Sequence, residues 1–108
     1  MKKGFLIVLV LIVCKTYGQT FEELTSAAKK AEKEKNYTQA IDFLEKALNL
    51  DNENHFIYNK LGLMYYRLNN YNRSIEYCNL TLKKVQNDSV ALYQRGFCYM
   101  GKSEFQKA

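Results

Sequence analysis

Few side chains in this sequence have the types and the spacing that catalysis or metal binding requires. The chain holds one histidine, His55, with no cysteine or acidic pair near it at the spacing of metal ligands. Glu32 and Glu34 stand two residues apart among lysines, so in a helix their carboxylates cannot share a face for acid–base chemistry. The isolated glycines form neither a phosphate-binding loop nor a dinucleotide-binding pattern. The sequence therefore predicts a protein that is not an enzyme, with no cofactor, no metal and no small-molecule substrate.

The charge of the chain gives no reason to expect nucleic acid as a partner. The formal net charge is +5, from 16 basic and 11 acidic residues. Lys2, Lys3 and Lys15 lie in the segment 1–18, which contains no acid, so the segment 19–108 carries almost as many acidic as basic side chains. Proteins that bind nucleic acid gather lysine and arginine in patches. Binding of RNA by a helical repeat is therefore a disfavoured alternative.

Residues 1–18 have the pattern of a signal peptide. Two lysines precede an apolar run from Phe5 to Cys14, and Thr16 and Gly18 supply the small residues that a signal peptidase requires before Gln19. The run has ten residues, about half of the ~20 that a membrane-spanning helix needs, which disfavours a permanent anchor. The pattern is typical of bacteria, so we expect a periplasmic or secreted protein.

A lipoprotein is a minor alternative to a cleaved and soluble product. Acylation would fall on Cys14, but the bulky Val13 fits poorly where a small residue is wanted before such a cysteine. The exported chain would then keep only Cys78 and Cys98, too few for a disulfide framework. We expect both to be small buried residues on helices. A single disulfide between them remains open, because it depends on their Cα atoms lying within about 7 Å.

After the signal peptide the sequence repeats, with a period of about 34 residues. The matched positions are apolar or small, and the register holds without insertions. The aligned sets are Ala28, Gly62 and Gly96; Ala31, Tyr65 and Tyr99; Tyr37, Tyr71 and Phe105; and Ala40, Ser74 and Ala108. A register kept through so many core-type positions indicates one structural unit used repeatedly.

Apolar residues within each unit recur with the period of an α-helix. Leu61, Met64, Tyr65 and Leu68 follow the spacing i, i+3, i+4, i+7. Asn, Asp and Ser at the breaks between these segments are residues that cap helices. The expected helices are 21–34, 37–50, 55–68, 71–85 and 89–101, with a sixth beginning near residue 104. Two pairs have the spacing of a capping box, Thr20 with Glu23 and Ser103 with Gln106.

Small residues predict how these helices pack. Ala28 and Gly62 lie where the second helix of a unit would cross the first. The second helix also has a small residue at this crossing, Ala40 in the first unit and Ser74 in the second. One such pair cannot bury its own apolar face, so the pairs must stack. The expected fold is all-α, an α-solenoid of stacked antiparallel helix pairs with about two and a half repeats. The expected units are residues 21–54, 55–88 and an incomplete 89–108.

These residues resemble the tetratricopeptide repeat family. The second unit carries the clearest match, through Tyr58, Leu61-Gly62, Tyr65, Ser74 and Cys78, and the resemblance covers Phe21 to Ala108. Two features depart from the family. Asn52 and Gln86 stand where its proline usually ends a unit, and Arg95 replaces an apolar residue.

The resemblance implies a function as well as a fold. In the family the first helix of each unit lines a concave groove that binds peptides of partner proteins. We therefore expect a protein–protein interaction scaffold whose partner has acidic and apolar residues. The residues expected to line the groove are Lys29, Asn59, Lys60, Leu63, Tyr66, Arg67, Tyr93, Gln94 and Phe97.

The last unit ends where its second helix should begin. Ala108 takes the position of Ala40 and Ser74, so the apolar groups of the third unit would lack their covering helix. We expect either a fragment of a longer array or a truncated array that self-associates through its open end. The alternative function is an N-terminal sensor or docking segment of a larger enzyme or signalling protein, truncated at residue 108.

Overall fold

A computed structural model describes residues 19–107 of the chain, with side chains up to residue 104. This part consists of five α-helices and contains no strand, so the all-α prediction is confirmed. The helices are α2 (Phe21–Lys33), α3 (Tyr37–Leu50), α4 (His55–Arg67), α5 (Tyr71–Lys84) and α6 (Ser89–Lys107). The expected signal peptide and Cys14 lie outside the described residues. Among the five described helices, none is both long and apolar enough to cross a membrane.

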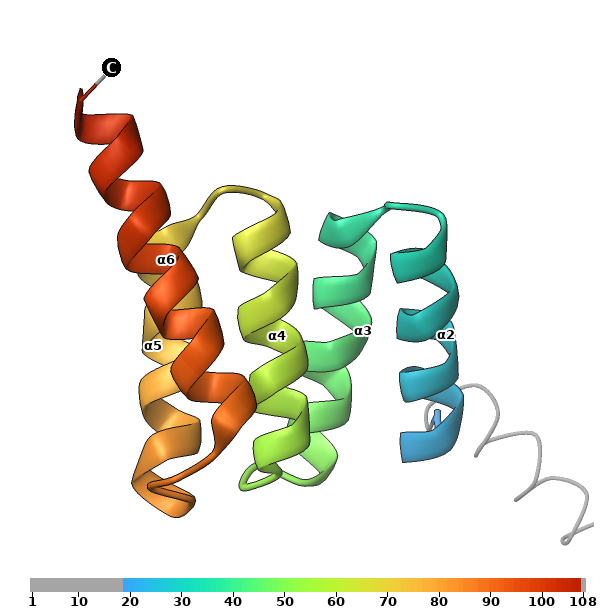
Figure 1. Ribbon diagram of the computed structural model, residues 1–108. Helices are drawn as coiled ribbons and strands as arrows, with labels where there is room; N and C mark the ends of the chain where they lie inside the picture. Colours follow the sequence, from blue (N-terminus) through green and yellow to red (C-terminus); the bar gives the residue numbers. More distant parts are fainter. Residues whose placement is uncertain (1–18, 108) are drawn as a thin grey trace, which may run out of the picture.

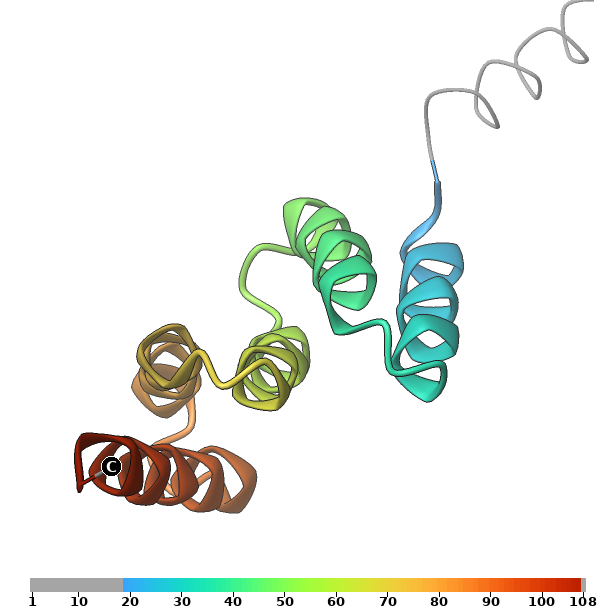
Figure 2. The ribbon, with the colours of Figure 1, turned by 90° about the horizontal axis from the view of Figure 1, so that it is seen from above.

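The helices form a row of antiparallel neighbours (Figure 1). Each helix packs mainly against the helices next to it in sequence, and α4 also contacts α6. Seen along the helices in Figure 2, α2, α4 and α6 lie along one side of the row, and α3 and α5 lie along the other. The predicted solenoid of helix pairs is therefore confirmed, and its first helices share one side.

The turn inside each helix pair is the same structure, used once in each of the first two repeats. Lys35 and Asn69 adopt the left-handed conformation, with φ of 59° and 61°, two residues after the ends of α2 and α4. The next residues, Asn36 and Asn70, cap α3 and α5, each side chain accepting a backbone hydrogen bond at 3.2 Å. These asparagines also close the preceding helices through their own N–H groups. Each asparagine thus ends one helix and begins the next, which explains the sharp turns.

Small residues allow the two helices of a pair to approach closely, as predicted. Ala40 and Ala47 of α3, and Ser74 and Thr81 of α5, are completely buried. The Ser74 hydroxyl donates a 2.7 Å hydrogen bond to the carbonyl oxygen of Gly62 in α4. Such a bond requires the two backbones to lie near each other. The serine therefore contributes both a small volume and a hydrogen bond between α4 and α5.

The C-terminal helix differs from the sequence prediction. The expected break at residues 101–103 is wrong, because α6 runs without interruption from Ser89 to Lys107. No new helix therefore begins near residue 104, because Ser103 lies within α6 and not before the start of a helix. Gly101 is a glycine for another reason: a Cβ atom there would lie 2.6 Å from Cζ of Tyr71. Close approach to an aromatic ring, rather than the end of a helix, accounts for this residue.

Candidate functional site

The predicted groove residues lie on the side formed by α2, α4 and α6, where they line adjoining hollows. Lys29 and Lys60 line a hollow of about 320 Å³ between α2 and α4. Six of the nine predicted residues come together in a second pocket, of about 400 Å³, between α4 and α6. This pocket is lined by Leu63, Tyr66, Arg67, Val90, Tyr93, Gln94 and Phe97. Side chains from helices of different repeats thus share one surface.

The half of this surface nearer to α2 is cationic. A hollow of about 300 Å³ is lined by five basic residues, one acid and one tyrosine: Lys29, Lys33, Lys35, Lys60, Arg67, Glu32 and Tyr37. The ammonium group of Lys60 pairs with the Glu32 carboxylate at 3.2 Å and so links α4 to α2. One carboxylate against five cations leaves an excess of positive charge, which attracts anionic groups. We refer to these seven residues as the cationic patch.

The half nearer to α6 is aromatic. The rings of Tyr66 and Phe97 lie 6.5 Å apart between centroids, and Tyr66 also approaches Tyr71 at 5.9 Å. Tyr93 remains 71% exposed and Phe97 51% exposed. Large aromatic side chains that stay in contact with water are typical anchors for binding partners. We refer to the 400 Å³ pocket as the aromatic pocket, and Arg67 lines both it and the cationic patch.

Besides Lys60, which bonds to Glu32, two predicted groove residues make hydrogen bonds between helices. Asn59 donates from Nδ2 to Asp88 at 3.3 Å and accepts at Oδ1 from the Thr81 hydroxyl at 2.9 Å. Gln94 donates from Nε2 to the Asn59 carbonyl oxygen at 3.3 Å and is only 7% exposed. These bonds hold α4, α5 and α6 together. The remaining seven predicted residues are the better candidates for contact with a partner.

Cys78 and Cys98 are free cysteines, buried between α5 and α6. Cys98 donates a hydrogen bond from its thiol to the Ser74 hydroxyl at 3.1 Å. Burial raises the pKa of Cys78 to about 11, and the pKa of Cys98 is raised for the same reason. Both thiols therefore stay protonated near neutral pH, which fits the prediction of small buried residues.

The remaining candidates for chemistry show no arranged site. The ring of His55 lies 4.2 Å from that of Phe56 at the start of α4. Within residues 19–107, no three histidine, cysteine or acidic side chains gather in a way that could hold a metal ion. The described part of the chain instead presents the adjoining cationic patch and aromatic pocket.

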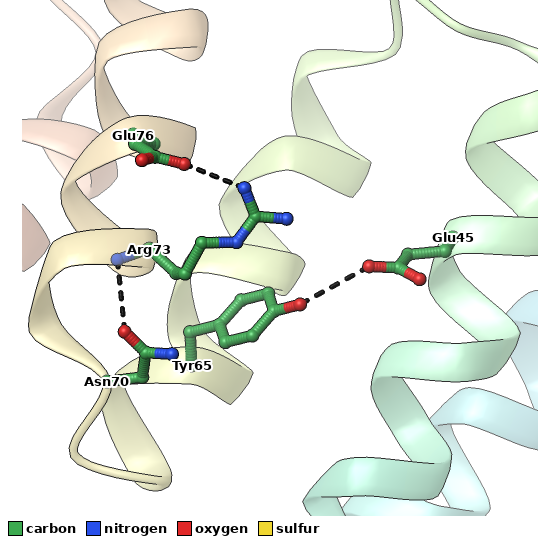
Figure 3. Close-up of polar contacts among 5 residues, drawn as sticks. All are labelled: Glu45, Tyr65, Asn70, Arg73 and Glu76. Carbon is green, nitrogen blue, oxygen red and sulfur yellow. Dashed lines mark hydrogen bonds and ion pairs between the residues drawn. The ribbon is translucent and has the colours of Figure 1, made fainter.

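Sequence reasoning missed one polar cluster, which ties α3, α4 and α5 together (Figure 3). The Arg73 guanidinium lies over the rings of Tyr65 and Tyr77, 5.3 and 5.4 Å from their centroids, and pairs with Glu76 at 2.7 Å. The Tyr65 hydroxyl donates to Glu45 of α3 at 3.3 Å. Hydrogen bonding with Tyr65, and then with Glu76, raises the pKa of Arg73.

Comparison with known proteins identifies the family. Residues 18–94 match the family described as the region in clathrin and VPS. The chain belongs to this family of helical repeats. It is also similar to human sperm-associated antigen 1, with 25% identity over 93 residues. That alignment covers 86% of this chain but only 10% of the relative, so the chain spans about a tenth of that protein's length.

Membership in this family agrees with the architecture of the chain. Clathrin and VPS repeats are helical repeats of a structural scaffold type, and helical repeat domains typically mediate contacts between proteins. The sequence prediction of a helical repeat scaffold is thereby supported. The more specific assignment to tetratricopeptide repeats, the unit boundaries and export remain predictions.

Proposed function

We propose that this chain is an interaction scaffold that holds a partner protein by a peptide segment laid along α2, α4 and α6. The observation that carries the proposal is the aromatic pocket next to the cationic patch, with Arg67 shared between them. A peptide with an apolar side chain for the pocket and neighbouring acidic residues for the patch matches both halves. Binding uses a largely preformed surface and needs no covalent step. We further propose that the repeats are of the tetratricopeptide type.

Selection of peptides on the full chain tests this proposal. We expect a random peptide display library to yield sequences in which acidic residues neighbour an aromatic or aliphatic residue. Replacing Tyr66→Ala together with Arg67→Ala should weaken the selected peptides by about tenfold or more, as expected for anchor residues. Phe56→Ala is the matched control, because Phe56 is 69% exposed and lies outside both hollows. If the selected peptides bind the double variant undiminished while its helical circular dichroism is retained, the groove is not the binding site.

We also propose that the chain is exported, with cleavage before Gln19. Support comes from the pattern of residues 1–18 and from Thr20, whose side chain caps α2 shortly after the expected cleavage site. Expression in a bacterial host with a functional secretion system, followed by mass spectrometry, tests this. A periplasmic product beginning at Gln19 is expected. An intact product beginning at Met1 in the cytoplasm would refute export.

A second candidate function is that of a docking segment within a larger enzyme or signalling protein. The observation that favours it is the match to one tenth of a much longer relative. Sequencing of the encoding DNA beyond the Ala108 codon decides between the two. An open frame that leads into a catalytic domain supports the docking segment, and a stop codon removes it.

A further inference from the structure

The chain holds a carboxylate of its own inside the cationic patch. Glu32 is the acidic residue among the seven that line this patch, and it accepts a hydrogen bond from the Lys60 ammonium group at 3.2 Å. Glu32 and Lys60 also line the neighbouring hollow of about 320 Å³ between α2 and α4, together with Lys29. The Glu32 carboxylate therefore lies where the acidic part of a peptide in the proposed groove would bind.

The repeat supports the assignment of Glu32 to the groove side of α2. Tyr66 lies one repeat of 34 residues after Glu32 and lines the aromatic pocket. Equivalent positions of successive repeats have the same orientation. At the position where α4 presents an aromatic ring to the groove, α2 thus presents a carboxylate.

The ion pair between Glu32 and Lys60 can open at little cost. The two side chains are 27% and 51% exposed, and ion pairs in contact with water contribute little to stability. Among the described side chains, the other four basic residues of the patch take part in no ion pair. A carboxylate that replaced Glu32 would therefore gain Lys60 as a partner and would also lie near further cations.

We propose that an acidic side chain of the partner takes the place of Glu32 on Lys60, so that Glu32 is an internal competitor that sets the specificity of the cationic patch. This inference rests on the proposed peptide groove and names the group that binds in one half of it. A carboxylate is the favoured ligand because the patch already binds one in this geometry.

Competition by Glu32 has a consequence for the choice of partner. A peptide with one acidic residue only exchanges one carboxylate for another on Lys60, so it gains little. A second, neighbouring acidic residue can interact with the cations that have no ion pair. The internal carboxylate thus discriminates against weakly acidic peptides and selects partners with at least two adjacent acidic side chains.

A capped dipeptide of two glutamates tests the cationic patch without involving the aromatic pocket, and a capped dipeptide of two glutamines is its neutral analogue. Each is titrated into the ¹⁵N-labelled full chain at about 0.1 M salt and followed by NMR. We expect the acidic dipeptide to shift the amide signals around Lys29 and Lys60 more strongly than the neutral one. Glu32→Gln should bind the acidic dipeptide about two- to fivefold more tightly, as expected for one partly exposed ion pair, and the neutral one no more tightly.

Glu22→Gln is the matched control, because it removes the same charge from the same helix. Glu22 is exposed, lines neither hollow, and lies ten residues or about 15 Å along α2 from Glu32. At this salt concentration, charges more than about 10 Å apart are largely screened. Glu22→Gln should therefore bind the acidic dipeptide as the original chain does.

The double variant Glu32→Gln with Lys60→Gln shows whether the dipeptide takes the place of Glu32. It is compared with Lys60→Gln alone. If a carboxylate of the dipeptide pairs with Lys60, the gain from Glu32→Gln should disappear once Lys60 is absent. A gain that persists without Lys60 would place the dipeptide elsewhere in the patch and would overturn the inference. Circular dichroism checks that each variant remains helical.

Three further results would overturn the inference: no shifts at about 5 mM acidic dipeptide, a concentration that reveals even weak sites, equal gains in Glu32→Gln and Glu22→Gln, or tighter binding of inorganic phosphate than of the dipeptide. The proposed function fails on a different result. A peptide that adds a phenylalanine to the two glutamates but binds no more tightly would exclude the aromatic pocket, while the gain in Glu32→Gln would still support the role of Glu32.

Discussion

At the scale of single residues, the three glycines within helices have different surroundings. Gly62 faces the Gln94 side chain, Gly101 faces the Tyr71 ring, and Gly96 faces open space. We expect Gly96→Ala to stabilise the chain by about 0.5–1 kcal/mol, the usual gain in a helix interior. Gly62→Ala and Gly101→Ala should instead destabilise it by about 1–3 kcal/mol, because each added methyl displaces a packed neighbour. Urea denaturation followed by circular dichroism measures all three; similar shifts for all three would contradict this account.

The buried thiol of Cys78 predicts a loss of stability at alkaline pH. Its ordinary pKa of 9.0 applies to the unfolded chain, while burial raises its pKa in the folded chain to about 11. Above pH 9 the unfolded state therefore binds fewer protons than the native state, and the free energy of unfolding falls with pH until about pH 11. Below pH 9 this contribution is fully present. Burial also raises the pKa of Tyr77, so this tyrosine likewise makes the free energy of unfolding fall as the pH rises.

The variant Cys78→Ala isolates the contribution of the thiol. Its free energy of unfolding should fall less steeply between pH 9 and 11 than that of the original chain, because the tyrosine and lysine contributions are common to both. The measurement is urea denaturation at a series of pH values under reducing conditions. Parallel slopes for the two proteins would show that this thiol does not titrate between the folded and unfolded states as proposed.

At the scale of helices, the residues that cap the helix ends determine where the helices begin. The Asn70 side chain accepts a hydrogen bond from the backbone N–H of Arg73 at the start of α5. Asn70→Ala should lower the free energy of unfolding by about 1 kcal/mol, and Asn70→Asp should largely restore it. Asn72→Ala is the control, because this exposed asparagine lies within the first turn and caps nothing. Thermal melting measures the stability of both alanine variants. If Asn70→Ala and Asn72→Ala lose equal stability, the Asn70 side chain does not stabilise α5 as a cap.

The same caps explain why most helix boundaries could be predicted from sequence. Helical periodicity and the asparagines at the breaks placed the first four helices within about one residue of their observed ends. The end of α6 could not be predicted in this way. Gly101 and Ser103 form a local stop signal, but the contact of Gly101 with Tyr71 depends on tertiary packing that no local pattern records.

The candidate surface was predictable to a similar degree. The register of the repeat indicates which residues share the side formed by α2, α4 and α6, because equivalent helices repeat their orientation. The register does not indicate which of these side chains already make hydrogen bonds within the chain. Asn59 and Gln94 were indistinguishable from exposed polar residues until α5 and α6 were placed beside them. The Arg73 cluster escaped prediction for the same reason, since Glu45 reaches it from α3, in the preceding repeat.

At the scale of the whole molecule, the chain behaves as a one-dimensional array in which each helix is stabilised by its neighbours. The central helix α4 packs against α3, α5 and α6, whereas α2 packs chiefly against α3 and α6 leaves one face uncovered. Stability in such arrays is roughly a sum of helix-pair and interface contributions, so the ends open more readily than the centre. We therefore expect native-state hydrogen exchange to be slowest in α4 and α5.

Mass spectrometry of deuterated peptides tests this gradient. In the free chain, the amides of α2 and of the last turns of α6 should exchange fastest. The amides of α4 should exchange more slowly, because the hydrogen bond from Gln94 to the Asn59 carbonyl oxygen also ties α4 to α6. Uniform exchange along the chain would contradict this account, since it would show that the five described helices open as one cooperative unit.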